Sequence, residues 1–259
     1  MSSSPLPRLS VAVITKNEAH RIERCLRSVA FADEIVVLDS GSTDDTVEIA
    51  RRLGAQVAVT DWPGFGPQKN RALAACGGDW VLSIDADEEV DDRLREAIMD
   101  VLRRSAAAAA DEDAGAPVGY WLTRSSFFCG QRIRHGDWRN DRVLRLFRRG
   151  RARFTDDLVH ERVDCPLPHG RLAGVLHHDS VDSVADMREK TVRYAQLGAS
   201  KLREQGRSVS LPSAAVHAGW TFVRGYLLRA GFLDGRAGFT IARLNALGTW
   251  LKYRQASGR

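Results

Sequence analysis

The sequence predicts an α/β protein built on a mostly parallel, doubly wound sheet, with a helical extension at the C-terminus. In the first hundred residues, short apolar runs alternate with segments whose apolar residues recur at helical spacing. The runs are apolar at nearly every position, which is typical of strands covered on both faces. Polar residues follow directly where these strands end, and sheets of this kind bind ligands beyond the carboxyl ends of their strands.

The first half of the chain supplies this alternation. Ser42 or Thr43 can cap one of the intervening helices, and Pro67 suits the first position of another. The strand-helix order, repeated, is the pattern of a doubly wound parallel sheet. The expected strands are residues 9–15, 34–38, 56–60 and 80–84.

The stretch from residue 77 to 90, GGDWVLSIDADEEV, is the segment around which we interpret the rest of the sequence. An apolar run bounded by Gly-Gly and by acids reads as a buried strand that ends at Asp85, Asp87, Glu88 and Glu89. A buried carboxylate needs water, a cation or a hydrogen-bond donor. Mg²⁺ is often held by one or two carboxylates together with substrate phosphates, so these acids predict a metal site. The plain alternative is an acidic turn that leads into an exposed helix.

Polar side chains at the ends of neighbouring strands are expected on one rim of the sheet. Each has a structural alternative when taken alone, since Asn17 suits a helix cap and Asp39 suits a turn. Together they favour a ligand site. The residues concerned are Thr15, Asn17, Asp39, Asp85 and Asp87.

No glycine-rich phosphate loop follows any of the expected strands. This argues against a dinucleotide-dependent oxidoreductase and against a P-loop NTPase. A nucleotide bound here would have its phosphates held by a metal ion and by Lys69, whose structural alternative is a solvated position on a helix.

Composition sets further bounds on the chain of 259 residues. Its net charge of +5 and pI near 9.3 favour anionic partners. The four cysteines form no CxxC pair, which fits a reducing cytosol. The first residues, MSSSPLPR, lack the apolar core of a signal peptide, and no run approaches the length of a membrane span.

Four segments together resemble the inverting family 2 glycosyltransferases: VAVITKNE, EIVVLDSGSTDDT, FGPQKNRAL and DWVLSIDADEEV. The chain is most similar to the bacterial lipopolysaccharide-core subgroup of the β-1,4-glucosyltransferase type, through LRLFRRG, LVHERV and the GFLDGRAG tail. The resemblance implies the GT-A fold, a Rossmann-like sheet that binds a nucleotide-sugar with a divalent metal.

By position in these motifs, the resemblance gives several residues a role in binding the nucleotide-sugar. Thr15, Asn17 and Glu18 match contacts to the base and ribose. Asp39 matches the acid that holds the base or ribose, and Lys69 the basic residue near the base or diphosphate.

The resemblance also implies a metal site for Mg²⁺ or Mn²⁺. Asp87 matches the direct metal ligand, and Asp85 the contact to ribose or to a metal-bound water. A histidine after residues 172–176 serves some members as a further metal or diphosphate contact, and His178 is favoured over His177 for it. Imidazole suits Mn²⁺ better than Mg²⁺.

The resemblance also implies that the region after the sheet faces the acceptor sugar. Trp138 and Asp141 are favoured as acceptor-binding residues, although Trp138 could instead belong to the core. Arg145 is expected to be solvated.

Inverting transfer needs a carboxylate that removes the proton of the acceptor hydroxyl. Glu161, in LVHERV, matches the family's acid at this position and is the expected catalytic base. The pair at residues 156–157 is the fallback, and a surface position on an edge strand is the structural alternative.

Aromatic and aliphatic residues interleave with arginine and lysine near the C-terminus, which predicts two basic amphipathic helices broken near Asp234 and Gly235. Such helices suit the surface of an anionic membrane, or they pack on the catalytic domain. The expected segments are a disordered tail at 1–8, a nucleotide-sugar-binding half at 9–104, a surface loop at 105–117, an acceptor-binding half at 118–210 and these helices at 211–259.

The sequence therefore predicts an enzyme that moves a hexose, expected to be glucose from UDP-glucose, to a lipopolysaccharide core or lipid-linked saccharide. The expected location is the cytoplasm, at the inner face of the membrane. Transfer of galactose or heptose to another envelope glycan is an alternative, as is a nucleotidyltransferase on a similar fold. Nucleic acid is not expected as a partner, because clustered acids at the strand ends would repel its phosphates.

Overall fold

The structure, a computed structural model, describes residues 5–108, 115–139, 141–156, 162–206 and 209–257. The chain forms two compact units. The sheet unit comprises Met1–Arg124 and Arg142–His178, and the helical unit comprises Ser125–Asp141 and Asp179–Arg259. The functional division at residues 9–104, 105–117, 118–210 and 211–259 stays a prediction, because compactness does not measure what a segment binds.

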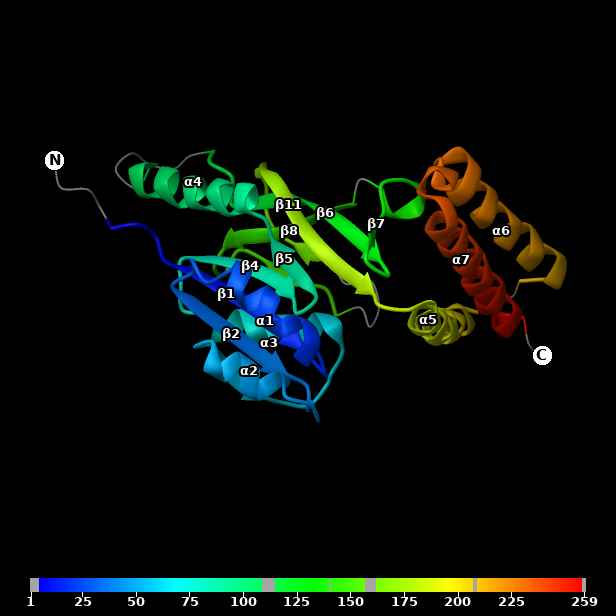
Figure 1. The fold of residues 1–259 in the computed structure, drawn as a ribbon, viewed down its shortest axis with the longest axis horizontal. Helices are drawn as coiled ribbons and strands as arrows, with labels where there is room; N and C mark the ends of the chain where they lie inside the picture. The colour runs from blue at the N-terminus through cyan, green and yellow to red at the C-terminus, as the bar shows by residue number, and fades with distance from the viewer. Residues whose placement is uncertain (1–4, 109–114, 140, 157–161, 207–208, 258–259) are drawn as a thin grey trace. The chain divides into compact units, whose positions relative to one another are not determined.

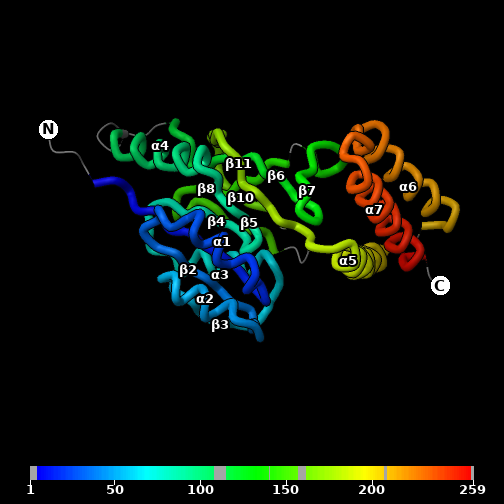
Figure 2. The backbone as a smooth tube through the Cα atoms, in the orientation of Figure 1, coloured from blue at the N-terminus to red at the C-terminus, as the bar shows by residue number. Residues whose placement is uncertain are grey.

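Strands and helices alternate through the first part of the sheet unit, which Figures 1 and 2 trace from blue to cyan. All four predicted strands are present, each within one residue of its expected bounds. Pro67 lies in the first turn of its helix but not at the first position, since that helix begins at Phe65. The elements are β1 Leu9–Thr15, α1 Ala19–Ser28, β2 Glu34–Asp39, α2 Thr46–Arg52, β3 Gln56–Val59, α3 Phe65–Ala75 and β4 Trp80–Asp85.

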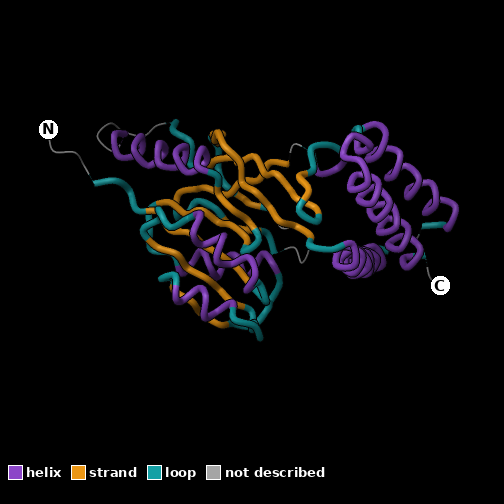
Figure 3. Tube along the Cα trace, viewed as in Figure 1, coloured by secondary structure: helices purple, strands orange, loops and turns teal. Residues whose placement is uncertain are grey.

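Apolar residues on both faces of the strands explain the layered packing, in which helices (purple) lie against strands (orange) in Figure 3. Val11 and Val13 of β1 belong to a core cluster with residues of α1, α2 and the helix α4 (Asp92–Ala108). Ala12 and Ile14, which alternate with them, pack with Ala72 of α3 in a second cluster. Because successive side chains of a strand point to opposite faces, a continuous apolar run needs helices on both sides.

The sheet continues in the order β3-β2-β1-β4-β8-β6-β11-β5. The first four strands are parallel, whereas β8 runs antiparallel to β4 and β5 antiparallel to β11. The predicted α/β fold is therefore confirmed, with a mixed sheet in which β1 to β4 are parallel. These further elements are β5 Glu88–Val90, α4 Asp92–Ala108, β6 Gly119–Phe128, β8 Asp141–Arg148, β9 Arg153–Phe154, β10 Val163–Asp164 and β11 His169–Val181.

Helix α4 runs into the segment that the sequence predicts to be a loop at 105–117. Alanine is the strongest helix former, so the alanines after Ser105 extend the helix to Ala108.

The helical unit carries the C-terminal helices, and α6 and α7 lie side by side in Figure 1, coloured orange and red. The predicted break is present, because α7 begins at Gly235 after a 3₁₀ turn. Among the described helices, none combines the length and apolar character that crossing a bilayer requires. The elements are β7 Gln131–Arg132, the 3₁₀ turn Gly136–Trp138, α5 Val184–Glu204, α6 Leu211–Val223, the π turn Arg224–Leu228, the 3₁₀ turn Gly231–Asp234 and α7 Gly235–Ala256.

The corner between α6 and α7 is fixed by the buried carboxylate of Asp234. It accepts hydrogen bonds from the backbone N–H groups of Arg134 (3.2 Å) and His135 (2.8 Å). Gly238 permits the close packing there, since a Cβ at this position would lie 1.8 Å from the carbonyl oxygen of Gly231.

The sheet unit offers a test of how its strands are tied together. Glu34 Oε2 accepts hydrogen bonds from Ser10 Oγ (2.5 Å) and Gly77 N (2.8 Å), and the Ser10 bond is the main cause that lowers the pKa of Glu34 below 4.5. A lowered pKa means stabilisation that is present above about pH 4.5 and is lost as the pH falls. We expect Glu34→Gln to destabilise the fold by about 1 kcal/mol at pH 7 in urea unfolding. The difference from wild type should shrink towards pH 3, and a difference that grows would contradict this account.

Candidate active site

The carboxyl ends of β1, β2 and β4 lie level with one another, as the sequence predicts. Thr15 pairs with Asp39 across β1 and β2, and Ile14 pairs with Asp85 across β1 and β4. The side chains predicted to bind the nucleotide-sugar therefore stand on one rim of the sheet.

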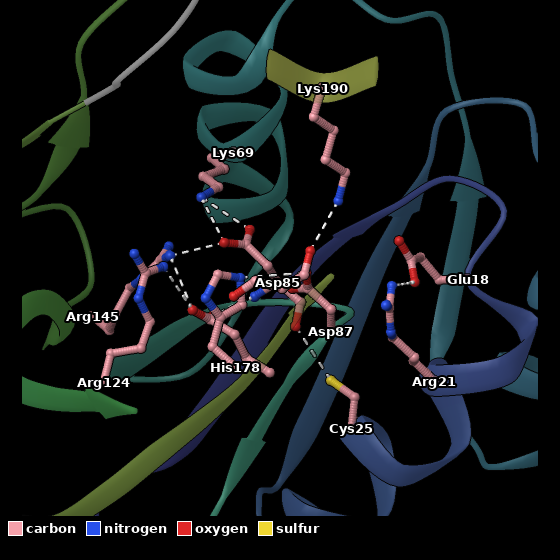
Figure 4. Close-up of polar contacts among 12 residues, drawn as sticks. Glu18, Arg21, Cys25, Lys69, Asp85, Asp87, Arg124, Arg145, His178 and Lys190 are labelled. Atoms are coloured by element: carbon pink, nitrogen blue, oxygen red, sulfur yellow. Dashed lines mark hydrogen bonds and ion pairs between the residues drawn. The ribbon is translucent and has the colours of Figure 1, made fainter. Parts of the chain in front are cut away.

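A cluster of opposite charges fixes the end of β4, as Figure 4 shows. Asp85 Oδ1 lies 2.9 Å from Lys69 Nζ, and Asp85 Oδ2 lies 2.8 Å from Arg145 Nη2. Burial alone raises the pKa of the Asp85 carboxyl, but the charges of Lys69 and Arg145 outweigh it and hold that pKa well below its usual value. Asp85 is therefore ionised at neutral pH, and Lys69, 2% exposed, is anchored to it.

Glu88 is the second carboxylate of this cluster and is fully buried. Its Oε2 accepts a hydrogen bond from the backbone N–H of Asp85 (2.9 Å), which closes the turn after β4. Its Oε1 lies 3.1 Å from Arg124 Nη1 and 3.5 Å from Arg145 Nη2. Arg145 thus bridges two carboxylates that are three residues apart.

The expectation that Arg145 is solvated is wrong, because this side chain is buried and paired. The reason is that the acids at the end of β4 need cations, and β8 and β6 supply Arg145 and Arg124. Neither arginine was predicted to belong to the site. A signal was present, since Arg145 is flanked by Leu144 and Leu146 in the buried stretch of β8, where a charged residue needs a buried partner.

Asp87 has a different partner from Asp85. Its Oδ2 lies 3.4 Å from His178 Nε2, and the two side chains are 18% and 19% exposed. Burial alone raises the pKa of Asp87, and the bond to His178 with its charge lowers it below the usual value. Burial lowers the pKa of His178, but the hydrogen bond and the charge of Asp87 together outweigh burial, so the pKa lies above its usual value of 6.5.

His178, rather than His177, is the histidine that lies against Asp87. It stands in register with Glu88 across β11 and β5, so these strands present it to the end of β4. His177 is paired with Glu89 and points to the other face of the sheet.

The Asp87–His178 pair has the chemistry to hold a divalent cation. Within the described ranges, no group of three or more His, Cys, Asp or Glu side chains is gathered for this purpose. A complete cage is not required, because Mg²⁺ binds through one or two carboxylates with water and substrate phosphates. A carboxylate oxygen and an imidazole nitrogen that reach the surface fit such a partial ligand set.

The turns after β1 and β2 are bonded to each other. Asn17 has a φ of 55°, a left-handed conformation that Asn tolerates, and its Oδ1 accepts a hydrogen bond from Thr43 N (2.8 Å). Its backbone N–H donates to Ser42 Oγ (2.8 Å). The predicted capping of α2 by Ser42 or Thr43 is wrong, because Asp45 is the N-cap residue and the two hydroxyl residues bind Asn17 instead.

Asp39 is fully buried and closes its own turn. Its Oδ1 accepts from the backbone N–H groups of Gly41 (2.9 Å) and Ser42 (2.8 Å), and its Oδ2 accepts from the Ser42 hydroxyl. These bonds give Asp39 the turn role that the sequence allows as its alternative. A role in holding base or ribose stays a prediction.

Thr15 and Glu18 complete the rim. Among the described residues, the buried Thr15 Oγ1 has no hydrogen-bond partner. Glu18 Oε2 lies 3.1 Å from Arg21 Nη1. Burial and the nearby charge of Asp87 raise the pKa of Glu18, which agrees with its place beside Arg21 and Asp87 in Figure 4.

The residues predicted to act on the acceptor lie either in the helical unit or outside the described residues. Trp138 packs against a core cluster of the helical unit, with its ring 6.3 Å from that of Phe128, as the alternative interpretation expects. Asp141, half-buried at the start of β8, belongs to the same unit. Glu161 lies outside the described residues, and Asp156 is exposed and paired with Arg153 (3.0 Å).

Comparison with known proteins places the chain in a family. Residues 10–165 match Glycosyl transferase family 2, which is more than half of the chain, so the protein belongs to this family. An uncharacterized glycosyltransferase of Rickettsia prowazekii (strain Madrid E) is 31% identical over 257 residues, which cover 95% of this chain and 86% of the relative. The chain is therefore a glycosyltransferase, and the nucleotidyltransferase alternative is set aside.

Two further proteins are similar. The lipopolysaccharide core biosynthesis glycosyltransferase LpsC of Rhizobium meliloti (strain 1021) is 30% identical over 253 residues, which cover 94% of this chain and 89% of LpsC. Glucosyl-3-phosphoglycerate synthase from Mycobacterium tuberculosis, in a crystal structure with Mn²⁺, uridine diphosphate and glucosyl-3-phosphoglycerate, is 28% identical with a TM-score of 0.34. That similarity covers 47% of this chain and 44% of the synthase, so the chain spans less than half the length of that enzyme.

Arg145 provides the test of the ion cluster. Removing one member of a buried ion pair leaves an uncompensated charge, which costs about 3 kcal/mol or more. We expect Arg145→Met to lower the free energy of unfolding by that amount in urea. The matched control is Arg153→Met, which breaks the exposed pair with Asp156 and should change stability by less than about 1 kcal/mol. Equal effects of the two substitutions would refute the central place of Arg145.

Proposed function

We propose that this glycosyltransferase moves a hexose, with glucose from UDP-glucose as the expected donor, to a lipopolysaccharide core or lipid-linked saccharide. The observation that carries the proposal is that two carboxylates at the end of β4 have different partners. Asp85 is paired with Lys69, and Asp87 is paired with His178. Similarity to LpsC supports a lipopolysaccharide core acceptor, and the resemblance to the β-1,4-glucosyltransferase type supports glucose. Galactose and heptose are the alternative sugars.

The charge of the cluster suits a diphosphate. Three cations, Lys69, Arg124 and Arg145, stand with three carboxylates, Asp85, Glu88 and Asp87, so their charges sum to 3 − 3 = 0, and a bound divalent metal would bring the site to +2. A partly exposed site with this excess attracts the anionic donor. In the proposal, Lys69 lies nearest to the diphosphate.

The rim residues would hold the nucleoside. Thr15 offers a hydroxyl that lacks a partner in the described structure, which suits a contact to ribose or base. Asn17 and Asp39 shape the two turns, and Glu18 adds a carboxylate with a raised pKa beside them. Ribose hydroxyls are hydrogen-bond donors, which matches this set of acceptors.

Asp87 and His178 would hold Mg²⁺ or Mn²⁺, with Asp85 in support. When bound, the metal would offset the negative charge that grows on the departing diphosphate. Lys69 acts in the same sense from its fixed position. Because Lys69 is already held by Asp85, it needs little reorganisation when the diphosphate leaves.

Glu161 is proposed as the base, on the strength of the family motif. It would accept the proton of the acceptor hydroxyl while the acceptor oxygen bonds to the anomeric carbon. The bond from that carbon to the diphosphate breaks on the opposite face, so the configuration inverts. Trp138 and Asp141 are proposed on the same ground to contribute to acceptor binding.

Peripheral contact with an anionic membrane is a further part of the proposal. Exposed apolar residues lie on one face of α6 and the π turn at helical spacing: Val216, Val223 and Leu227. The corner that follows exposes Leu228, Phe232 and Leu233, with the basic side chains of Arg236 and Arg243 exposed on α7. An apolar surface beside basic residues is typical of proteins that bind at the bilayer interface.

Asp87 provides the test of the proposed reaction. We expect Asp87→Asn to abolish transfer from UDP-glucose in the presence of Mn²⁺ and to leave the melting temperature close to that of wild type, because Asp87 lies outside the ion cluster. Asp92→Asn, at an exposed acid near the start of α4, is the control and should retain full activity. Near wild-type turnover of Asp87→Asn would remove this assignment.

Leu228 provides the test of membrane contact. Wild-type protein should float with vesicles that contain phosphatidylglycerol and bind less to pure phosphatidylcholine. We expect Leu228→Glu to weaken vesicle binding by about tenfold or more, because a buried leucine contributes about 2 kcal/mol and the new charge opposes anionic lipid. The control is Val59→Glu, at an equally exposed apolar residue of β3, which should bind as wild type. Wild-type protein that stays with the soluble fraction would contradict the proposed contact.

A further inference from the structure

The helical unit contains an open cleft of about 690 Å³ between α5, α6 and α7. Asp137, in the 3₁₀ turn next to Trp138, closes one side of it. This volume is within the range of about 300–1,000 Å³ that is usual for small-molecule sites. The cleft lies wholly within the helical unit and shares no residue with the cluster at the end of β4.

Aromatic rings line the cleft. Trp220 is 54% exposed, although it is a large apolar residue, and Tyr194 is also exposed. His217 and Tyr253 are stacked, with ring centroids 4.8 Å apart. Flat aromatic faces with polar edges pack well against the C–H face of a sugar ring.

Cations gather around Asp137, the one acid among the described residues that line the cleft. Its Oδ1 lies 2.6 Å from Arg229 Nη1 and 3.3 Å from Arg224 Nη2, and its Oδ2 accepts a hydrogen bond from Asn245 Nδ2 (3.4 Å). Within the described structure, the buried Nε of Arg224 has no hydrogen-bond partner. Two guanidinium groups thus share one carboxylate, so their charge is only partly neutralised.

Lys252 adds a third positive charge to the cleft. Its Nζ lies 4.7 Å from the centre of the Tyr253 ring. The charges of Arg224, Arg229 and Lys252 against Asp137 sum to 3 − 1 = +2. An excess of this size in a cleft favours an anionic ligand.

Hydroxyl groups complete the lining. Thr221 Oγ1 and Thr249 Oγ1 lie 3.3 Å apart, and they donate to the carbonyl oxygens of His217 (2.9 Å) and Asn245 (3.0 Å). Their remaining lone pairs can accept hydrogen bonds from sugar hydroxyls.

We propose that this cleft binds a saccharide that carries a phosphate or carboxylate group. The sugar ring would pack on Trp220, its hydroxyls would meet the threonines, and its anionic group would meet Arg224 and Lys252. The arginines suit such a group, because a guanidinium forms paired hydrogen bonds with phosphate or carboxylate. This proposal is independent of the proposed donor site, because binding to the cleft is measured without any transfer reaction.

Calorimetric titration of the full chain tests the proposal. Glucose 6-phosphate and galacturonate should bind with dissociation constants of about 1 mM or tighter, and glucose and inorganic phosphate should each bind at least about tenfold more weakly. Trp220→Ala and Lys252→Gln should each weaken binding of glucose 6-phosphate by about tenfold.

Matched substitutions control for position and chemistry. Trp62→Ala removes an exposed tryptophan of the sheet unit, and Arg254→Gln removes an exposed cation two residues after Lys252. Both should bind glucose 6-phosphate as wild type. Melting temperatures of all four variants check that each is folded.

Three results would overturn the proposal: no saturable binding of either anionic sugar, binding that survives both Trp220→Ala and Lys252→Gln, or equal binding of inorganic phosphate, which would mean that the cleft recognises charge alone.

The source of the saccharide is distinguished by transfer kinetics. If it is part of the acceptor, Trp220→Ala raises the KM for acceptor and leaves that for the donor unchanged. If it is a free effector, glucose 6-phosphate changes the rate of wild type but not of Trp220→Ala. Loss of transfer in Asp87→Asn leaves this binding intact, so failure of one proposal does not imply failure of the other.

Discussion

Two carboxylates at the end of β4 are held by three cations, and the rest of the candidate site takes its position from these ion pairs. Asp85 joins Lys69 and Arg145, and Glu88 joins Arg145 and Arg124. The cost of burying charge makes such a cluster a weak source of stability. Its role is to fix positions: α3, β4, β5, β6 and β8 each place one of these side chains, and each element must be in register for the charges to pair.

The same cluster explains why two aspartates one residue apart have different surroundings. Asp85 is occupied by cations, so its carboxylate is a fixed counter-charge. Asp87 turns to His178 and keeps part of its surface exposed, so its carboxylate and the imidazole are accessible to a ligand. A metal and a diphosphate would then meet side chains that were placed before either arrived, which is the arrangement that electrostatic catalysis needs.

The parallel half of the fold could be predicted because its signals are local. The apolar runs at β1, β2 and β4 specify strands, and acids at their ends specify a rim. The partners of those acids could not be predicted, since Arg145 is distant from Asp85 in sequence and a charged residue in a strand can face either water or the core. The prediction of the helix cap was wrong for a related reason. Ser42 and Thr43 have the chemistry of helix caps, but the Ser42 hydroxyl accepts a hydrogen bond from the backbone N–H of Asn17, and the backbone N–H of Thr43 donates to Asn17 Oδ1.

A crystal of the protein grown with MnCl₂ and uridine diphosphate tests the central claim most directly. The anomalous signal of manganese locates the ion independently of the rest of the density. The account predicts one manganese peak bonded to Asp87, with the diphosphate between this ion and Lys69. A manganese ion bound away from Asp87, or a diphosphate bound with Asp87 still paired to His178 alone, would contradict it.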